Sequence, residues 1–515
     1  MRLGDKHRTT RHVVISDFSG GLNTAAAQEM LKENELWRCE NMDVDHNSGL
    51  LRVVDGNERV LSAPEGTTYR ALLYDRVNDG YLAVDAKGAV YRPSLTSEKP
   101  ELGASIGMLT GKEFPVSAPW EDGLLIASGG QLQYFNGKEL KTLAHAPKAS
   151  TTVFVRGGRV LVNDRTAGND SNVYYSAIGD EETWEDTSKD DSSSKWLEVG
   201  YKDGGKVLMF VSMAEDVLVV KDNRCVYRII GNYPDWSVAE VSRNVPCASA
   251  LSVYAAGTSA LILGDGRLQE LGINQYYGDI RAQDVGERVR DRLAAVDGEN
   301  VRIISVPLYR QLWFPLKERW VLVYDLALGS FYQRRFAREN LVDAVCVGEA
   351  LYIVRSSSIC RVKRHLGYDD GVKQLWRFAT RRAIAHDDFL LKRGAVNITP
   401  HFDTLVEGNV KIGGLMLALP TPYVAYRLWH NYSRVYHNRR KACGANERVF
   451  NLYEAGDEVY ENFEPVWHNY QPVYNPAALA LGARCVYRNR TLAVSGTGAG
   501  CCFLLNRLDV DVAEV

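Results

Sequence analysis

The sequence predicts an all-β protein that combines a β-propeller with a separate β-rich, sandwich-like domain. Short strands of alternating apolar and polar residues recur along most of the chain, separated by Gly, Asp and Asn turns. Period-2 alternation between such turns is typical of half-buried strands. After about residue 370 the strands become longer and more widely spaced, which indicates a second domain.

The first element is the repeat that predicts the propeller. Seven hairpins recur, and their first strands begin near residues 80, 123, 158, 216, 260, 311 and 349. The mean spacing of about 45 residues is the length of one four-stranded propeller blade. We therefore expect residues 66–365 to form a propeller of about six or seven blades, without a W-D or kelch signature.

One segment in this region departs from the strand pattern. Between residues 281 and 296, apolar side chains at Val285, Val289, Leu293 and Val296 follow helical spacing, with charges on the opposite side. This periodicity predicts one amphipathic helix inserted in the propeller. Such a helix would either cover the edge of a blade or face a neighbouring subunit.

The C-terminal region, 366–515, predicts an antiparallel β-rich platform. In it W-H-N-Y, followed after two residues by V-Y, occurs twice, 38 positions apart, so that Trp429 and Tyr432 correspond to Trp467 and Tyr470. These aromatic side chains would make a contact platform for a partner subunit or a sugar. The alternative, which we favour, is that two equivalent strands pack them in the domain core.

Composition excludes several classes of protein. The chain carries 61 Lys+Arg against 64 Asp+Glu, a net charge of −3, whereas a dedicated nucleic-acid binder normally has a basic domain. The longest uncharged stretch, Asn244–Gly264, contains proline and serines and is interpreted as two strands and a turn, not a membrane helix. The N-terminus lacks an apolar h-region, so we expect no secretory signal.

No motif for catalysis, a cofactor or a metal is recognisable. The nine cysteines are dispersed without C-x-x-C spacing, which predicts reduced thiols. The S-G-T-G-A-G-C stretch at Ser495–Cys501 lacks the helix and the acidic residue of a dinucleotide site. Ser176–Trp184 matches a sialidase Asp-box only in part. We therefore expect no enzyme activity, no cofactor and no metal site.

The most specific pattern lies between Val13 and Gly56. It combines F-x-G-G-L-N-T, a short helix expected near Asn34, an N-x-D-V-D turn and a G-L-L-R strand. Here the chain resembles tail hub, or nozzle, proteins of tailed bacteriophages, the packaged-DNA stabilisation and tubular tail proteins of short-tailed phages. A second match is V-Y-Y-S-A-I-G-D-E-E-T-W at Val173–Trp184. The matching residues of the first pattern are Phe18, Gly20, Gly21, Leu22, Asn23, Thr24, Asn41, Asp43, Gly49, Arg52 and Gly56.

The resemblance implies a structural role in a virion tail. Residues 1–65 would dock on the portal adaptor, with Phe18, Gly20, Gly21 and Asn23 as candidate interaction residues. Copies of the chain would form a homo-oligomeric ring, usually a hexamer, around the DNA-ejection channel below the portal. The ring would help to retain packaged DNA and would carry tail fibres, spikes or a needle. It would be assembled in the cytoplasm of the host bacterium.

The near-neutral charge is compatible with this role, because double-stranded DNA must slide through a channel without sequence-specific binding, and a dense basic lining would hold it. Two other classes stay open. A virion-borne propeller hydrolase or depolymerase acting on host polysaccharide would gather carboxylates and aromatic side chains at one propeller mouth. A receptor-binding fibre module would lack the adaptor-facing segment and would usually be a trimer.

Overall fold

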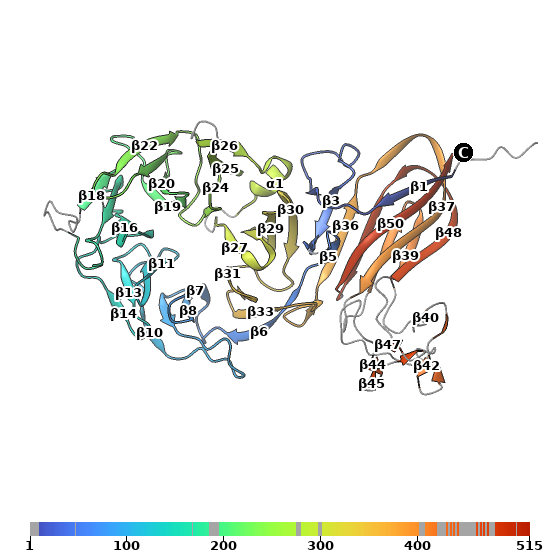
Figure 1. The fold of residues 1–515 in the computed structure, drawn as a ribbon, viewed down its shortest axis with the longest axis horizontal. Coiled ribbons are helices and arrows are strands. Elements are labelled where there is room, and N and C mark those ends of the chain that lie inside the picture. The colour runs from blue at the N-terminus through green and yellow to red at the C-terminus, as the bar shows by residue number, and fades with distance from the viewer. Residues whose placement is uncertain are drawn as a thin grey trace, which may run out of the picture. The chain divides into compact units, whose positions relative to one another are not determined.

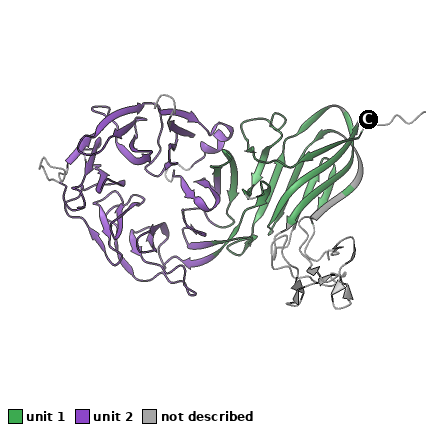
Figure 2. Ribbon diagram, in the orientation of Figure 1, with its two compact units in different colours: residues 1–58, 323–338, 362–515 green, residues 59–322, 339–361 purple. Residues whose placement is uncertain are grey.

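The structure, a computed structural model of the chain, divides into two compact units (Figure 2). The propeller unit comprises residues 59–322 and 339–361, and the sandwich unit comprises residues 1–58, 323–338 and 362–515. No helix in the described part of the chain is long and apolar enough to cross a membrane. The residues described are 10–46, 48–166, 168–184, 195–273, 280–296, 301–400, 407–419, 429–430, 433–434, 436–437, 440–441, 460–461, 464–465, 467–468, 471–472, 479–500 and 502–514.

The propeller unit begins with five antiparallel sheets, each made of four strands that follow one another in the chain (Figure 1). In order, the strands of these sheets are β7 (Tyr69–Asp75), β8 (Gly80–Asp85), β9 (Ala89–Tyr91) and β10 (Ser105–Met108); β11 (Val116–Trp120), β12 (Gly123–Ala127), β13 (Gln133–Phe135) and β14 (Leu140–Thr142); β15 (Val153–Arg156), β16 (Arg159–Asn163), β17 (Asn172–Tyr175) and β18 (Lys195–Glu198); β19 (Val207–Met213), β20 (Asp216–Lys221), β21 (Val226–Ile230) and β22 (Ser237–Ser242); β23 (Val253–Ala255), β24 (Ser259–Gly264), β25 (Arg267–Ile273) and β26 (Ile280–Asp284).

Two further sheets bring the number of blades to seven, the upper of the two predicted values. The sixth blade contains β27 (Ile304–Val306), β28 (Gln311–Pro315) and β29 (Trp320–Asp325). A 3-10 turn, η2 (Pro307–Tyr309), lies between β27 and β28. The seventh contains β31 (Asp343–Val347), β32 (Ala350–Val354), β33 (Ser358–Lys363) and, as its fourth strand, β6 (Gly56–Ser62). Because β6 precedes the first sheet in the chain, the last blade is completed by an early strand. The predicted all-β propeller is confirmed.

The seven predicted hairpins are the second and third strands of the seven sheets. The second strands begin within one residue of the predicted positions, as β8, β12, β16, β20, β24, β28 and β32 show. Every residue of β12 and of β16 is buried. These strands have the clearest apolar signal because both of their faces are covered by neighbouring blades.

The core of the propeller unit lies between adjacent blades. Between the third and fourth sheets, for example, Leu161 and Tyr175 pack in one cluster with Phe210 and Val219. The first and seventh sheets meet through Tyr81 and Tyr352, whose rings stand edge to face with centroids 5.2 Å apart. Apolar packing of this kind repeats around the ring and closes it.

The helix predicted between residues 281 and 296 is wrong in most of its length. The segment begins with strand β26, continues through a 3-10 turn, η1 (Glu287–Val289), and has one helical turn, α1 (Arg290–Leu293). Pairing with β25 overrides the helical periodicity, since β26 supplies the fourth strand of the fifth sheet. The apolar side chains of Val289 and Leu293 are nevertheless buried.

The sandwich unit takes most of its strands from two sheets. The first has the order β30 (Ser330–Arg335), β4 (Met42–Val44), β5 (Leu51–Val53), β50 (Phe503–Glu514), β37 (Ala383–Pro400) and β48 (Leu479–Leu492), and β1 (Thr10–Ile15) also pairs with β50. The second has the order β2 (Gly21–Leu22), β3 (Glu35–Glu40), β36 (Leu375–Thr380), β49 (Val494–Ala499), β38 (Glu407–Ile412) and β39 (Leu415–Ala418). The short strands β34 (Tyr368–Asp369) and β35 (Val372–Lys373) pair with each other.

The two sheets pack face to face around aromatic side chains. Trp376, on β36, is fully buried and meets Phe503, on β50, edge to face with ring centroids 5.0 Å apart. Glycines make room for these rings: a Cβ on Gly408 would lie 2.5 Å from the Trp376 ring, and one on Gly496 would lie 2.3 Å from the Phe378 ring. The core of this unit therefore depends on large side chains facing glycine.

The two compact units differ from the three consecutive segments expected from the sequence, 1–65, 66–365 and 366–515. Residues 10–58 do not stand apart as a separate segment, since β2 to β5 are strands of the two sandwich sheets. Residues 323–338, from the middle of the chain, belong to the same unit and supply β30. The sandwich unit is thus assembled from three separate stretches of sequence.

Candidate functional site

The Gly20-Gly21 pair lets the backbone of the N-terminal motif approach its neighbours closely. Gly21 has a φ of +65°, and a Cβ there would lie 2.6 Å from the carbonyl oxygen of Phe331. A Cβ on Gly20 would lie 2.8 Å from the carbonyl oxygen of Asn34, which accepts a hydrogen bond from the Gly20 N–H. Both positions exclude a side chain. Phe18 beside them is buried in the same unit.

Asn23 holds the turn that follows the glycine pair. Its Oδ1 accepts hydrogen bonds from the N–H groups two and three residues on, each at 3.2 Å, and its Nδ2 donates to Glu35 Oε2 at 3.1 Å. The same Glu35 oxygen accepts the Lys32 N–H at 2.9 Å. The helix predicted near Asn34 is absent, and turns stand in its place. Side-chain acceptors take backbone N–H groups that a helix would have needed.

Asn41 joins three stretches of the chain. It adopts a left-handed conformation, with φ of +55°, between β3 and β4. Its Nδ2 donates to the carbonyl oxygens of Leu375 at 2.6 Å and Arg335 at 3.2 Å, and its Oδ1 accepts the Arg335 N–H at 2.7 Å. One amide side chain therefore fastens the N-terminal motif to residues 323–338 and to β36. Asparagine suits this position because it tolerates positive φ and both donates and accepts.

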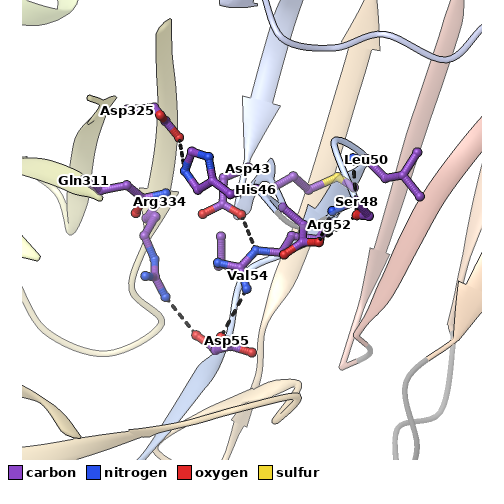
Figure 3. A network of polar contacts seen from close by, with 12 residues as sticks. Asp43, His46, Ser48, Leu50, Arg52, Val54, Asp55, Gln311, Asp325 and Arg334 are labelled. Atoms are coloured by element: carbon purple, nitrogen blue, oxygen red, sulfur yellow. Dashed lines mark hydrogen bonds and ion pairs between the residues drawn. The ribbon is translucent and has the colours of Figure 1, made fainter. Parts of the chain in front are cut away.

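A network of charged side chains continues from this point (Figure 3). The Arg52 guanidinium donates to Asp43 at 2.7 Å and lies 3.4 Å from Asp55. His46 Nε2 lies 3.0 Å from a carboxylate oxygen of Asp325, a residue with no exposed surface. These carboxylates are buried and paired with cationic side chains, which is the condition under which buried charges are tolerated.

The end of the motif is tied in by backbone groups. The Arg334 guanidinium donates to the Asp55 carbonyl oxygen at 2.8 Å, and Asp55 Oδ1 accepts the His365 N–H at 2.7 Å. A Cβ on Gly56 would lie 2.0 Å from the carbonyl oxygen of Tyr368, so only glycine fits there. The motif residues thus act by fixing backbone approach and by satisfying buried polar groups.

Burial raises the pKa of two groups in this region. Burial raises the pKa of Asp325, and the charge of His46 acts in the opposite direction. Burial, with the charge of Asp43, raises the pKa of the Cys39 thiol well above its ordinary value, so the reactive thiolate is disfavoured. Among the described residues no group of three or more His, Cys, Asp or Glu side chains is arranged to hold a metal ion.

The second sequence match lies in the third blade. Trp184 is buried in the cluster between the second and third sheets, as expected for a residue that plugs a blade interface. Its indole N–H donates to the Glu181 carbonyl oxygen at 2.6 Å. Hydrogen bonds from Thr183 and from backbone N–H groups lower the pKa of Asp180 in the same turn, against a smaller opposing effect of burial. This match also specifies a turn and a core contact.

Only part of the repeated W-H-N-Y stretch of the C-terminal region lies within the described residues. Trp429 begins β40 (Trp429–His430) and Trp467 begins β46 (Trp467–His468). Each strand forms the same two-residue antiparallel pair, β40 with β41 (Ser433–Arg434) and β46 with β47 (Gln471–Pro472). Tyr432 and Tyr470 lie outside the described residues. The two copies therefore share a backbone hairpin, and further short strands nearby are β42 (Tyr436–His437), β43 (Arg440–Lys441), β44 (Tyr460–Glu461) and β45 (Glu464–Pro465).

The two faces of the propeller unit differ in charge. Turns between the first and second, and between the third and fourth, strands of each sheet lie on one face, which we call the acidic face. On it, the described residues include ten exposed carboxylates and five exposed Lys or Arg. The opposite, basic face carries the remaining turns and the connections between blades, with eleven exposed Lys or Arg and seven exposed carboxylates. The near-neutral chain therefore has a polarised propeller.

Carboxylates on the acidic face contact aromatic side chains. The Trp120 indole N–H donates to Glu181 Oε2 at 2.9 Å, and the Tyr134 hydroxyl hydrogen-bonds to Asp122. Burial and the hydrogen bond to Asp122 raise the pKa of Tyr134 above its ordinary range. Both carboxylates extend from loops of neighbouring blades.

Comparison with known proteins identifies no relative by sequence. No family model matches the chain, and no curated protein matches it. Solved structures with some likeness include U3-55K (11% identity, TM-score 0.38, 60% of this chain and 99% of that one), the RRP9 WD40 repeats (10%, 0.39, 60% and 97%) and YCF48 from Cyanidioschyzon merolae (10%, 0.38, 60% and 98%). These values support no functional assignment, and the fold stands on the strand order itself.

Several residues of the buried network were not predicted from the sequence. Asp325, Arg334 and Asp369 contribute to it, but none belongs to a recognisable motif. Asn57 donates to Asp369 at 2.8 Å across 312 positions of sequence. No local pattern signals a pairing at such separation, although the polar residues closing β29 and β30 interrupt otherwise apolar strands.

Proposed function

We propose that the protein is a structural component of the tail of a short-tailed bacteriophage, a hub or nozzle subunit of a homo-oligomeric ring around the DNA-ejection channel. In this role it would be assembled in the cytoplasm of the host and carried in the virion. The ring, a hexamer in the family that the chain resembles, would help to retain packaged DNA and support fibres or spikes.

The observation that carries the proposal is the structural role of the residues in the N-terminal motif. Gly21 and Gly56 allow close approach of backbone segments, and Asn41 hydrogen-bonds to backbone groups. Arg52 pairs with Asp43 in the interior. The motif therefore encodes a way of fastening the N-terminal segment into a β-sandwich. A resemblance based on such residues reflects shared architecture, which is what a shared structural role requires.

Docking on an adaptor would use the exposed residues around the motif. Phe18, Gly20, Gly21 and Asn23 are buried within the single chain, so their proposed part in the interaction is to shape the segment. Met30 is 78% exposed and Trp37 is 46% exposed in the same stretch. Large exposed apolar side chains of this kind are favourable anchors for a protein partner.

Self-association is supported by the charges of the propeller. The acidic face of one copy and the basic face of another attract each other, which favours heterologous, head-to-tail contacts between copies. Heterologous contacts close into rings when the rotation between copies permits. Passage of DNA requires only that the channel lining hold no dense array of unpaired cations.

The proposal is tested by locating the protein in particles. Mass spectrometry and electron microscopy of purified virions should find the chain in a ring below the portal. A Met30→Ser/Trp37→Ser double variant should fold, with unchanged circular dichroism, and should enter fewer particles. A Met108→Ser variant, exposed on β10 of the propeller unit, is the matched control. Absence of the chain from particles would refute the proposal.

A second candidate, a virion-borne hydrolase of host polysaccharide, is favoured by one observation, the carboxylates held against Trp120 and Tyr134 on the acidic face. It predicts turnover of capsule or peptidoglycan by the isolated chain. That turnover should disappear in Asp122→Asn and Glu181→Gln variants. Absence of turnover by the wild-type chain would remove this candidate.

A further inference from the structure

One buried cation of the propeller unit has no hydrogen-bond or ion-pair partner among the residues that the structure describes. Arg302, just before β27, is 4% exposed, and it makes no hydrogen bond or ion pair with any described residue. Its Nε is fully buried and unpaired. An arginine stays protonated in a protein, and a buried charge without an ion-pair partner is unfavourable.

Two other buried cations of the unit, Lys221 and Arg159, have hydrogen-bond partners. The Lys221 ammonium donates to Asp203 at 2.6 Å, to the Val199 carbonyl oxygen at 2.8 Å and to Ser171 at 3.2 Å. The Arg159 guanidinium donates to the Ser176 carbonyl oxygen at 2.7 Å. The propeller unit can therefore provide hydrogen-bond acceptors for a buried cation. Among the described residues, Arg302 lacks the acceptors that Lys221 and Arg159 have.

The surroundings of Arg302 place it at the propeller axis on the basic face. Its guanidinium carbon lies 4.5 Å from the centroid of the Phe114 ring, which precedes β11, the innermost strand of the second blade. Arg70, on β7 of the first blade, is close enough for its charge to lower the pKa of Arg302, although burial is the larger cause. Residues from the first, second and sixth blades therefore converge where the innermost strands begin.

The carboxylate whose charge acts on Arg302, that of Asp343, already accepts hydrogen bonds. Asp343, which begins β31, accepts the Leu72 N–H at 3.0 Å and the Ala344 N–H at 2.9 Å. Its charge acts on Arg302 from a distance, but no ion pair joins them. The Arg70 guanidinium donates to the Lys112 carbonyl oxygen. The Phe114 ring covers one face of the Arg302 guanidinium, so any partner must approach its edge.

We propose that this mouth of the propeller axis is a binding site for a small oxyanion, in which the edge of the Arg302 guanidinium binds two oxygens of a phosphoryl or carboxylate group. Bidentate pairing with two parallel N–H···O bonds is a preferred geometry of the arginine guanidinium with both groups, and here the Nη groups would make it. The nearby Arg70 adds a second positive charge. The anion would supply the ion pair that Arg302 does not make with any described residue.

The test compares the full chain in sodium phosphate, sodium acetate and sodium chloride at equal ionic strength and pH 7. The melting temperature should be higher in phosphate or acetate than in chloride, and calorimetric titration with the same salts should give a dissociation constant. The salt with the larger effect identifies the group. Equal melting temperatures in the three salts would overturn the proposal.

Variants separate binding from folding. Arg302→Gln should abolish the anion-dependent rise and weaken binding at least tenfold, yet in chloride it should be no less stable than the wild type, because an unpaired charge is removed. Arg302→Lys, which keeps the charge without the fork, should also bind several-fold more weakly. Arg267→Gln, an exposed arginine at the start of β25, should bind as the wild type does. An Arg302→Gln chain that is destabilised in chloride but keeps the full phosphate effect would refute the site.

Discussion

In the propeller unit most strands pair with the next strand along the chain, whereas in the sandwich unit neighbouring strands come from distant segments. β15 pairs with β16 and β16 with β17, while β1 pairs with β50 and β3 with β36. The propeller is therefore stabilised by repeated apolar contacts between sheets. The sandwich also needs polar side chains and glycines that fix where remote segments meet. A substitution in one blade leaves the equivalent contacts of the other blades intact, whereas a contact between two remote segments of the sandwich has no second copy.

The largest expected effect is at the closest backbone junction of the sandwich unit. Gly21→Val would combine a β-branched residue at φ of +65° with a clash against Phe331, costing about 3 to 6 kcal/mol. Urea unfolding followed by limited proteolysis should show the sandwich unit opening first. Gly66→Ala, in a propeller-unit loop with φ of +74° and no atom within 4 Å, should cost only about 1 kcal/mol. Equal losses in the two variants would contradict the comparison.

A core truncation in each unit asks whether the units unfold separately. Trp376→Ala in the sandwich and Phe210→Ala between the third and fourth blades should each cost about 3 to 5 kcal/mol. Each should shift only the transition of its own unit in a two-probe urea titration. If both variants shifted a single common transition, the units would be one cooperative block and the comparison would fail.

Removing a hydrogen-bonding asparagine should also cost more stability in the sandwich unit than in the propeller unit. Asn41→Ala removes the hydrogen bonds to two carbonyl oxygens and from one N–H, and should cost about 2 to 3 kcal/mol. Asn136→Ala removes a local turn in which Oδ1 accepts the N–H groups of Lys138 and Glu139, and should cost about 1 kcal/mol. Denaturant midpoints of the two variants measure the difference, and a larger loss at Asn136 would reverse the argument.

The smallest effect concerns pH and a carboxylate of the propeller. Burial raises the pKa of Asp343 to about 6, although Arg302 and two N–H groups act against it. Because the folded pKa lies above the ordinary value of 3.8, this contribution to stability is present below about pH 4 and is lost as pH rises towards 6. Asp343→Asn should therefore gain on the wild type by about 1 to 2 kcal/mol between pH 4 and pH 7. Melting curves across this range check the sign, and a difference that does not change with pH would disprove it.

The same comparison explains how far the sequence predicts the structure. The blades were predictable because β8, β12 and their equivalents are apolar runs between tight turns, and each packs against the next in the chain. In β26 strand pairing outweighed helical periodicity, which a single segment cannot reveal. The partners of Asn41 and Asp55 lie about 280 to 330 residues away, so chain topology alone brings them together. For Arg302 the sequence gives no signal, because the lack of a partner is a property of the folded surroundings.

The fourth strand of the seventh blade has a consequence for synthesis. Residues 59–62 of β6 leave the ribosome before any blade, yet they pair with β33, the last propeller strand to be made. The N-terminal strands β3 and β5 wait longer still, for β36 and β50. During translation these early strands expose unpaired edges while five blades form between them and their partners. An unfinished chain is therefore most open to mispairing at its beginning, and completion of the C-terminal third ends that exposure.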